Sequence, residues 1–389
     1  MTGADRLIAE GWESATGLGA LAVGVATNHT GRLSDGTHLV DALLDSGVEV
    51  VAIFSPEHGF EGMAAEGARI YSAGETYRDV VIHSLYGTST RPDEAMLQEV
   101  DVFLFDIQDV GARFYTYTST MARTMEAAAA RGIPYVVLDR PDPIGGRIIE
   151  GPVLREEYSS FVGLYPVPIR HGFTIGEYAL WMIGEGHIPG GEDLDLRVVE
   201  MKEWTRGMWY SDTGVPWVQP SPNMATPATA LVYPGICFVE GTNVSEGRGT
   251  EQPFELVGAP WADDIGITSW LNGLGLAGVQ FHPATFTPGI PGTSVEVKWK
   301  GDLCKGVRIE VTDREAFRAV VSGVAVVSAF RRFHPEEFRW RNAHFDRLAG
   351  VDWLREAIEE EGDPFELEQR WQAETTAWRE NAARYWLYP

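Results

Sequence analysis

Four short apolar runs constrain the fold of this 389-residue chain more than any other feature of its sequence. They span residues 21–26, 48–54, 102–105 and 135–138. Stretches of helical character separate them, and short continuous apolar runs that alternate with helices are typical of buried strands in a parallel sheet. The N-terminal part of the chain is therefore predicted to form an α/β fold around such a sheet.

The rest of the chain is less regular and indicates a second, smaller α+β domain. Helices are predicted at residues 38–46, 92–99, 117–131, 174–185, 315–333 and 364–381. Thr174 is the expected N-cap of the fourth helix. Further strands are predicted at residues 295–300 and 307–311. We place the larger domain at residues 1–260 and the smaller one at 261–389.

The charge of the chain excludes two classes of partner. It carries 31 Lys and Arg against 56 Asp and Glu, a formal charge of −25. Nucleic acids and anionic membranes require basic surfaces, so neither is an expected partner. No apolar run reaches the roughly 20 residues that span a bilayer. No signal peptide is visible, which predicts a cytoplasmic protein unless such a segment has been removed. Cys237 and Cys304 are expected to be buried free thiols, with a disulfide as the alternative.

Polar side chains follow each of the four predicted strands at its carboxyl end. Because ligands of open α/β sheets bind outside the carboxyl ends of the strands, these side chains are predicted to converge on one site. The candidates for this site are Asn28, Glu57, His58, Asp106, Gln108, Asp109, Asp139 and Arg140.

Glu57 is the strongest single candidate, because it follows a buried strand and lies between Pro56 and His58-Gly59. Burial raises the pKa of a carboxyl group, as a general acid acting near neutral pH requires. The alternative is that this segment is only a turn or a cap.

The stretch at 106–117 adds acids, an amide, Arg113, Tyr115 and Tyr117 after the third strand. Carboxylates and amides bind sugar hydroxyls, and tyrosine rings stack on sugar faces. In the alternative interpretation Asp109 caps the following helix and Arg113 pairs with an acid.

Two later segments complete the candidate site. Arg170 and His171 form the first, and the glycine-rich stretch 240–251 contributes Thr242, Asn243, Glu246, Arg248 and Glu251. Arg170 or Arg248 could bind a carboxylate through two hydrogen bonds. A solvated surface loop is the alternative for the glycine-rich stretch.

Several established motifs are absent from the sequence. It has no dinucleotide fingerprint after a strand, no Walker loop, no Gly-x-Ser-x-Gly elbow and no His-Glu-x-x-His. A metal site built from His29, His58, Asp106 and Asp109 remains an alternative.

Seven segments, in order along nearly the whole chain, resemble the NamZ-like exo-β-N-acetylmuramidase family. They are TNHTG (27–31), SPEHGFEG (55–62), DIQDVGARFYTYTSTM (106–121), LDRPDPIGG (138–146), PIRHGFTIGEY (168–178), SPNMATPATALVYPG (221–235) and EGTNVSEGRGTEQPF (240–254).

The resemblance implies a Rossmann-like domain without nucleotide or other cofactor, a smaller second domain, and an active site in the cleft between them. It implies release of N-acetylmuramic acid (MurNAc) from the non-reducing end of short peptidoglycan fragments. Glu57 is then the general acid/base, and Asn223 in the sixth segment is a candidate substrate-binding residue.

The second catalytic group stays open at this point. Most glycosidases use a second carboxylate, for which the candidates are Asp106, Asp109, Glu246 and Glu251. The 2-acetamido group of the substrate is the alternative. Arg113, Arg170 or Arg248 would bind the lactyl carboxylate of MurNAc. Two other functions compete with the muramidase: a muropeptide-binding protein without activity, and a metal-dependent hydrolase of another amino-sugar bond.

Overall fold

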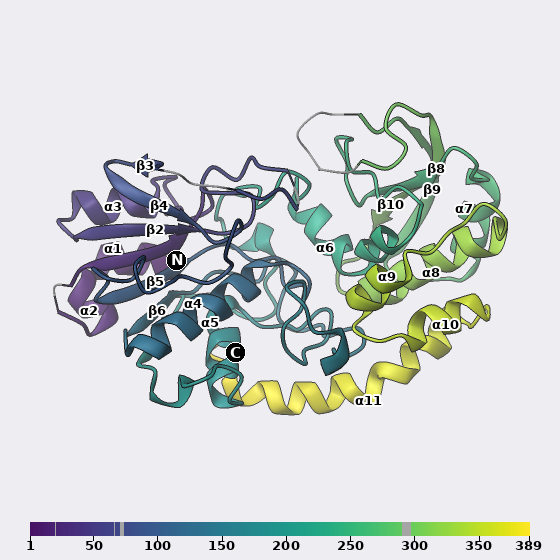
Figure 1. The fold of residues 1–389 in the computed structure, drawn as a ribbon. Coiled ribbons are helices and arrows are strands. Elements are labelled where there is room, and N and C mark those ends of the chain that lie inside the picture. Colours follow the sequence, from purple (N-terminus) through teal and green to yellow (C-terminus); the bar gives the residue numbers. More distant parts are fainter. Residues whose placement is uncertain (20, 66, 71–73, 290–296) are drawn as a thin grey trace.

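The computed structural model describes residues 1–389 except 20, 66, 71–73 and 290–296, and confirms the predicted α/β class (Figure 1). Seven strands form the main sheet in the order β3-β4-β2-β1-β5-β6-β7. All neighbours run parallel except β3 and β4. The strands are β1 (Val23–Thr27), β2 (Val50–Ser55), β3 (Thr76–Tyr77), β4 (Val80–Ser84), β5 (Val102–Asp106), β6 (Tyr135–Leu138) and β7 (Leu196–Val199). The four predicted strands are β1, β2, β5 and β6.

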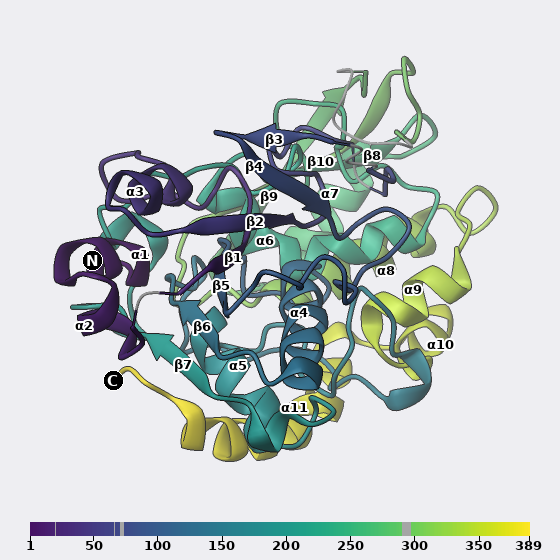
Figure 2. The ribbon, with the colours of Figure 1, turned by 60° about the vertical axis from the view of Figure 1, so that its left-hand side comes forward.

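Both faces of this sheet are covered, which explains why its central strands are apolar at every position. Along β5, Val102 and Leu104 face one core cluster, while Phe103 and Phe105 face the other. The helices α1 (Gly3–Glu10), α2 (Trp12–Thr16) and α3 (Leu39–Asp45) lie on the first side, whereas α4 (Tyr117–Arg131) and α5 (Ile175–Gly184) lie on the second (Figure 2).

One predicted helix cap is confirmed, and one predicted helix is absent. Thr174 caps α5 in a capping box with Glu177, as predicted. The helix predicted at 92–99 is wrong, because this segment forms turns. Asp93 accepts a hydrogen bond from the Met96 amide, so its side chain closes a local turn instead of starting a helix.

The smaller unit contains an antiparallel sheet in the order β8-β10-β9. Its elements are α6 (Pro227–Ile236), β8 (Leu256–Ala259), α7 (Asp264–Gly273), β9 (Val279–Phe286), β10 (Cys304–Val311), α8 (Ala319–Phe333), α9 (Asn342–Ala349), α10 (Trp353–Glu359) and α11 (Pro364–Ala382). The strand predicted at 307–311 lies in β10. Of the segment 295–300, residues 295 and 296 lie outside the described residues and the rest forms a turn.

The predicted domain boundary at residue 260 falls directly after β8, which is already part of the second sheet. Helix α6 lies still earlier and packs against α8 at the contact of Gly235 with Gly323. A Cβ on Gly323 would lie within 2.5 Å of the Gly235 backbone, and a Cβ on Gly235 would lie 1.8 Å from the carbonyl oxygen of Ala319. Only glycine at both positions allows the two helices to approach this closely.

The C-terminal segment connects the two units. Helix α11 runs from the smaller unit back to the larger one (Figure 1). Trp378 packs against Phe173 and Trp181, with ring centroids 5.3 and 5.0 Å apart. The Tyr388 hydroxyl then donates to Asp139 at the end of β6, at 2.6 Å. These contacts fix the relative position of the two units.

Short 3₁₀ helices interrupt the connections, at η1 (Glu156–Tyr158), η2 (Gly191–Asp193), η3 (Tyr210–Asp212), η4 (Cys237–Gly241) and η5 (Ala383–Tyr385). Cys237 and Cys304 are buried free thiols, as expected. None of the helices in the described part of the chain is long and apolar enough to cross a membrane.

Candidate active site

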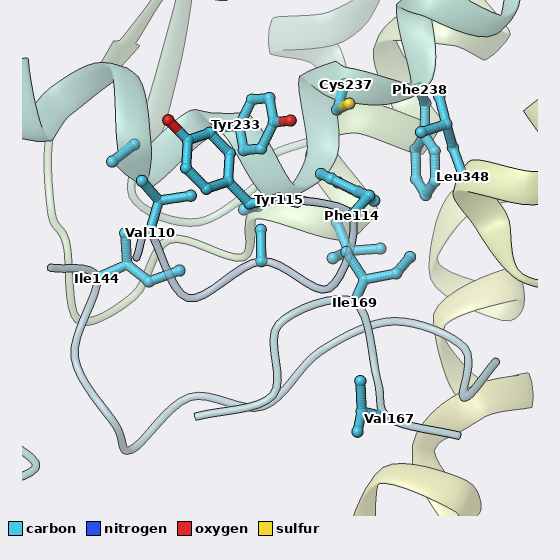
Figure 3. Close-up of a cluster of buried hydrophobic side chains, with 14 of the residues drawn as sticks. Val110, Phe114, Tyr115, Ile144, Val167, Ile169, Tyr233, Cys237, Phe238 and Leu348 are labelled. Atoms are coloured by element: carbon cyan, nitrogen blue, oxygen red, sulfur yellow. The ribbon is translucent and has the colours of Figure 1, made fainter. Parts of the chain in front are cut away.

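A pocket of about 140 Å³ lies where the two units meet. The larger unit contributes the segments that follow β2 and β5, which carry Glu57 and Tyr115. The smaller unit contributes Tyr233 of α6, Glu240 of η4 and His344 of α9. Part of this lining is visible in Figure 3, where Tyr115 lies beside Tyr233, and Cys237 follows on the next turn of the chain. The pocket is thus assembled from distant parts of the sequence.

Glu57 is held in a defined orientation inside this pocket. It lies two residues after β2 and is only 5% exposed. One carboxylate oxygen accepts a hydrogen bond from the Gly67 amide at 3.0 Å, and the other accepts one from the Thr116 hydroxyl at 2.7 Å. Thr116 directly precedes α4. Both of these donors are uncharged, and together they fix the orientation of the carboxyl group.

His58 follows Glu57 with a positive φ of 70°, a conformation that non-glycine residues adopt rarely. Its Nδ1 lies 2.7 Å from the carbonyl oxygen of Ala64, so Nδ1 carries the proton and Nε2 is the acceptor. Burial lowers the pKa of His58, although Glu57 acts in the opposite direction. The imidazole is therefore neutral near pH 7.

One wall of the pocket is aromatic. Tyr233 forms edge-to-face contacts with Phe114, Tyr115 and Phe254, with ring centroids 5.2, 5.9 and 4.8 Å apart. Burial raises the pKa of Tyr115 far above its ordinary value, so this phenol stays neutral. Buried aromatic side chains with a hydroxyl provide both a flat apolar surface and a polar group for a sugar.

Another part of the lining is charged. The Glu240 carboxylate accepts a hydrogen bond from the Arg248 guanidinium at 2.6 Å, and it lies 3.5 Å from Nε2 of His344. Arg248 also contacts Glu246 at 3.3 Å, and Lys298 contacts the second oxygen of Glu246 at 2.9 Å. Burial alone would raise the pKa of Glu240, but Arg248 and His344 hold it well below its ordinary value.

Five of the predicted site residues line the pocket together: Glu57, His58, Tyr115, Asn223 and Arg248. Of these five, Glu57 and His58 follow β2 and Tyr115 follows β5, whereas Asn223 and Arg248 belong to later segments. The other predicted residues lie outside the pocket lining, and most of them bond to one another.

The strand-end residues form a buried polar network instead. Arg140 contacts both oxygens of Asp106, at 2.5 and 2.8 Å. Asp139 accepts hydrogen bonds from the Arg140 and Gly176 amides and from the hydroxyls of Thr174 and Tyr388. These carboxylates hold strands β5 and β6 to the segments that cross their ends.

The neighbouring predicted residues are also engaged with the protein. The Asn28 amide donates to the Tyr117 hydroxyl at 3.0 Å, and Tyr117 donates to the carbonyl of Pro220. The Gln108 amide donates to the carbonyls of Asp109 and Pro141. Asp109 accepts from the Gly111 amide, and burial raises the pKa of Asp109 to about 7. The Asp109 side chain therefore closes a local turn after β5.

Arg113 and Arg170, both predicted to bind the substrate, are buried and connect different segments of the chain. The Arg113 guanidinium donates to the carbonyls of Pro152, Val167 and Leu348, each at 2.8 Å. Arg170 pairs with Glu150 at 3.0 Å. Neither of them lines the pocket.

The remaining predicted residues lie in three settings. His171 is buried beside Tyr178, and burial lowers its pKa to about 3. Thr242 and Asn243 bond to backbone groups of the smaller unit. Glu246 is buried behind Arg248 and Lys298, whereas Glu251 is exposed on the same loop. His29, which was part of the metal alternative, contacts the carbonyl of Gln219 at 2.8 Å. Across the described ranges, no three His, Cys, Asp or Glu side chains come together as metal ligands.

Several lining residues could not be identified from the sequence. Thr116, Tyr233 and Glu240 lie within the segments that contain predicted site residues, but no pattern distinguishes them from their neighbours. Cys237 and His344 had no signal, because a lone residue in an apolar or mixed helix shows no functional pattern.

Comparison with known proteins agrees with this arrangement. Residues 23–228 match the family model described as exo-beta-N-acetylmuramidase NamZ, N-terminal, and residues 231–388 match its C-terminal counterpart. The peptidoglycan beta-N-acetylmuramidase NamZ of Bacillus subtilis (strain 168) is 47% identical over 339 residues, covering 87% of this chain and 80% of that protein.

Two crystal structures of DUF1343 family proteins from Bacteroides fragilis share the fold. They have TM-scores of 0.89 and 0.80 at 31% and 33% sequence identity, and both comparisons cover 100% of this chain and 98% of the other. With both family models matched along nearly the whole chain, this protein belongs to the NamZ family.

Proposed function

We propose that this protein is an exo-β-N-acetylmuramidase that hydrolyses the β-1,4 linkage of a MurNAc unit at the non-reducing end of short peptidoglycan fragments. The observation that carries the proposal is the carboxyl group of Glu57, buried in the pocket and oriented by Gly67 and Thr116. The Bacillus subtilis relative, named as a peptidoglycan beta-N-acetylmuramidase, supports the same reaction. Peptidoglycan turnover or recycling is the corresponding cellular role.

In the proposed reaction Glu57 acts first as an acid and then as a base. Its carboxylic acid form donates a proton to the glycosidic oxygen as the bond to the anomeric carbon breaks. The resulting carboxylate then accepts a proton from the water that attacks the anomeric carbon. The fixed contacts with Gly67 and Thr116 keep the carboxyl group in place through both steps.

The lining of the pocket supports binding of a sugar. Its aromatic side chains provide an apolar surface on which a sugar ring can stack. Of the three arginines predicted to bind the lactyl carboxylate, Arg248 alone lines the pocket, so we assign that contact to Arg248.

The test is incubation of the purified protein with a chromogenic β-MurNAc glycoside and with its β-GlcNAc counterpart, each with and without a chelator. The proposal predicts release from the MurNAc compound only, at a rate that the chelator does not change. A rate lost on chelation would instead favour a metal-dependent hydrolase. Tight binding of MurNAc-GlcNAc without any release of sugar would favour a muropeptide-binding protein.

A further inference from the structure

Two carboxylates line the described part of the pocket, Glu57 and Glu240. None of the four acids that the sequence suggested as the second catalytic group is among the lining residues. Asp106 is paired with Arg140, Asp109 closes a turn, and Glu246 is buried behind its cationic partners. The pocket therefore offers one further carboxylate for a reaction in which glycosidases commonly use two.

The two pocket carboxylates have opposite surroundings. Glu57 is contacted by an amide and a hydroxyl, which carry no charge. Glu240 faces Arg248 at 2.6 Å and His344 at 3.5 Å, and the Cys237 thiol lies 3.5 Å from its first oxygen. A neighbouring guanidinium favours the ionised form of a carboxyl group. A carboxylate held ionised in an active site can stabilise a positive charge that develops beside it.

We propose that Glu240 is the second catalytic carboxylate of this pocket, an anion that stabilises the positive charge developing at the anomeric carbon. This inference rests on the proposed function. As the bond from the anomeric carbon to the glycosidic oxygen breaks, its electron pair stays with that oxygen, which takes the proton of Glu57. The anomeric carbon becomes positive and is stabilised by the Glu240 carboxylate. Water then adds to this carbon and gives a proton back to Glu57.

Arg248 positions Glu240 in this scheme, in addition to the contact with the lactyl carboxylate that is assigned to it above. It also contacts Glu246, whose other oxygen is held by Lys298, so two anions and two cations form one buried cluster. The competing explanation is that Glu240 serves only to neutralise this cluster. Glu246 has the same cationic partner but lies outside the pocket lining, and it therefore provides the matched comparison.

The experiment compares Glu240→Gln with Glu246→Gln and Glu57→Gln. Each variant is assayed on MurNAc-GlcNAc and on an aryl β-MurNAc glycoside with a good leaving group, and its folding is checked by circular dichroism. Glu240→Gln should lower kcat about a thousandfold on both substrates, since removal of one preorganised electrostatic contact costs about 10²–10³ in rate. Glu57→Gln should lose far more on the disaccharide than on the aryl glycoside, which needs little acid assistance. Glu246→Gln should lose less than about tenfold.

Two results would overturn the assignment of Glu240: a folded Glu240→Gln with more than a tenth of the wild-type kcat, or equal losses for Glu240→Gln and Glu246→Gln. If Glu240→Gln does not fold, Glu240→Asp provides the test. It keeps the charge but withdraws the carboxylate by one methylene group, and it should lose at least about tenfold in kcat. A wild-type protein inactive on both substrates would contradict the proposed function itself.

Discussion

The buried ion pair between Asp106 and Arg140 allows a test of whether Asp106 has a structural or a catalytic role. Asp106 is fully buried, Arg140 is 3% exposed, and the guanidinium contacts both carboxylate oxygens. Asp106→Asn keeps the shape but leaves the Arg140 charge without its counter-ion. Breaking a buried pair in this way costs about 3–5 kcal/mol. With an unfolding entropy of about 2.1 cal/mol/K per residue, a chain of this length should lose about 4–6 °C in Tm.

The assay is thermal unfolding by circular dichroism, combined with turnover of the chromogenic MurNAc glycoside by the folded variant at 25 °C. The expected result is a lower Tm with kcat within about tenfold of wild type. The double variant Asp106→Asn/Arg140→Gln should lose less stability than the two single changes added together, because the partners are coupled. A variant with wild-type Tm and no turnover would refute this reasoning and return Asp106 to the catalytic candidates.

Two further predictions concern other residues that the sequence placed in the site. Burial raises the pKa of Asp109 to about 7 in the folded protein, compared with about 3.9 in an unfolded chain. Between about pH 4 and pH 7 the native state therefore binds a proton that the unfolded chain has released. The free energy of unfolding falls as the pH rises through this range. Asp109→Asn, which is always neutral, should therefore raise Tm at pH 8 and have little effect at pH 4; an equal shift at both pH values would contradict this. Arg113→Met removes the donors to three buried carbonyl groups and should lower the free energy of unfolding, measured in urea, by about 2–5 kcal/mol. An unchanged midpoint of urea unfolding would show that these hydrogen bonds contribute nothing to stability.

The parts of the fold that depend on local patterns of apolar residues could be predicted from the sequence. The four central strands are apolar along their whole length because both faces of the sheet are covered, and this pattern is visible in the sequence. Strands β3, β4 and β7 were not predicted, because they lie at or next to the edges of the sheet and are partly exposed. The sequence does not reveal how far the second unit extends, since β8 and α6 join it through contacts with distant residues.

The site was predictable only in part, for a different reason. Polar residues do collect at the carboxyl ends of the strands, but the sequence cannot tell which of them satisfy one another. Asp106 and Arg140, 34 positions apart, pair with each other. Glu57 instead accepts hydrogen bonds from the Gly67 amide and the Thr116 hydroxyl and lines the pocket. Glu240 lies on a 3₁₀ helix of five residues, too short to show a periodicity from which its direction could be predicted.

The most direct test of the central claim is turnover by Glu57→Gln on MurNAc-GlcNAc, measured together with binding of the same disaccharide by calorimetry. Glu61→Gln is the matched control, because Glu61 is exposed four residues further along the same segment. Glu57→Gln should fold and bind the disaccharide but release no MurNAc, while Glu61→Gln should keep wild-type turnover. Near-normal release of MurNAc by a folded Glu57→Gln would contradict it.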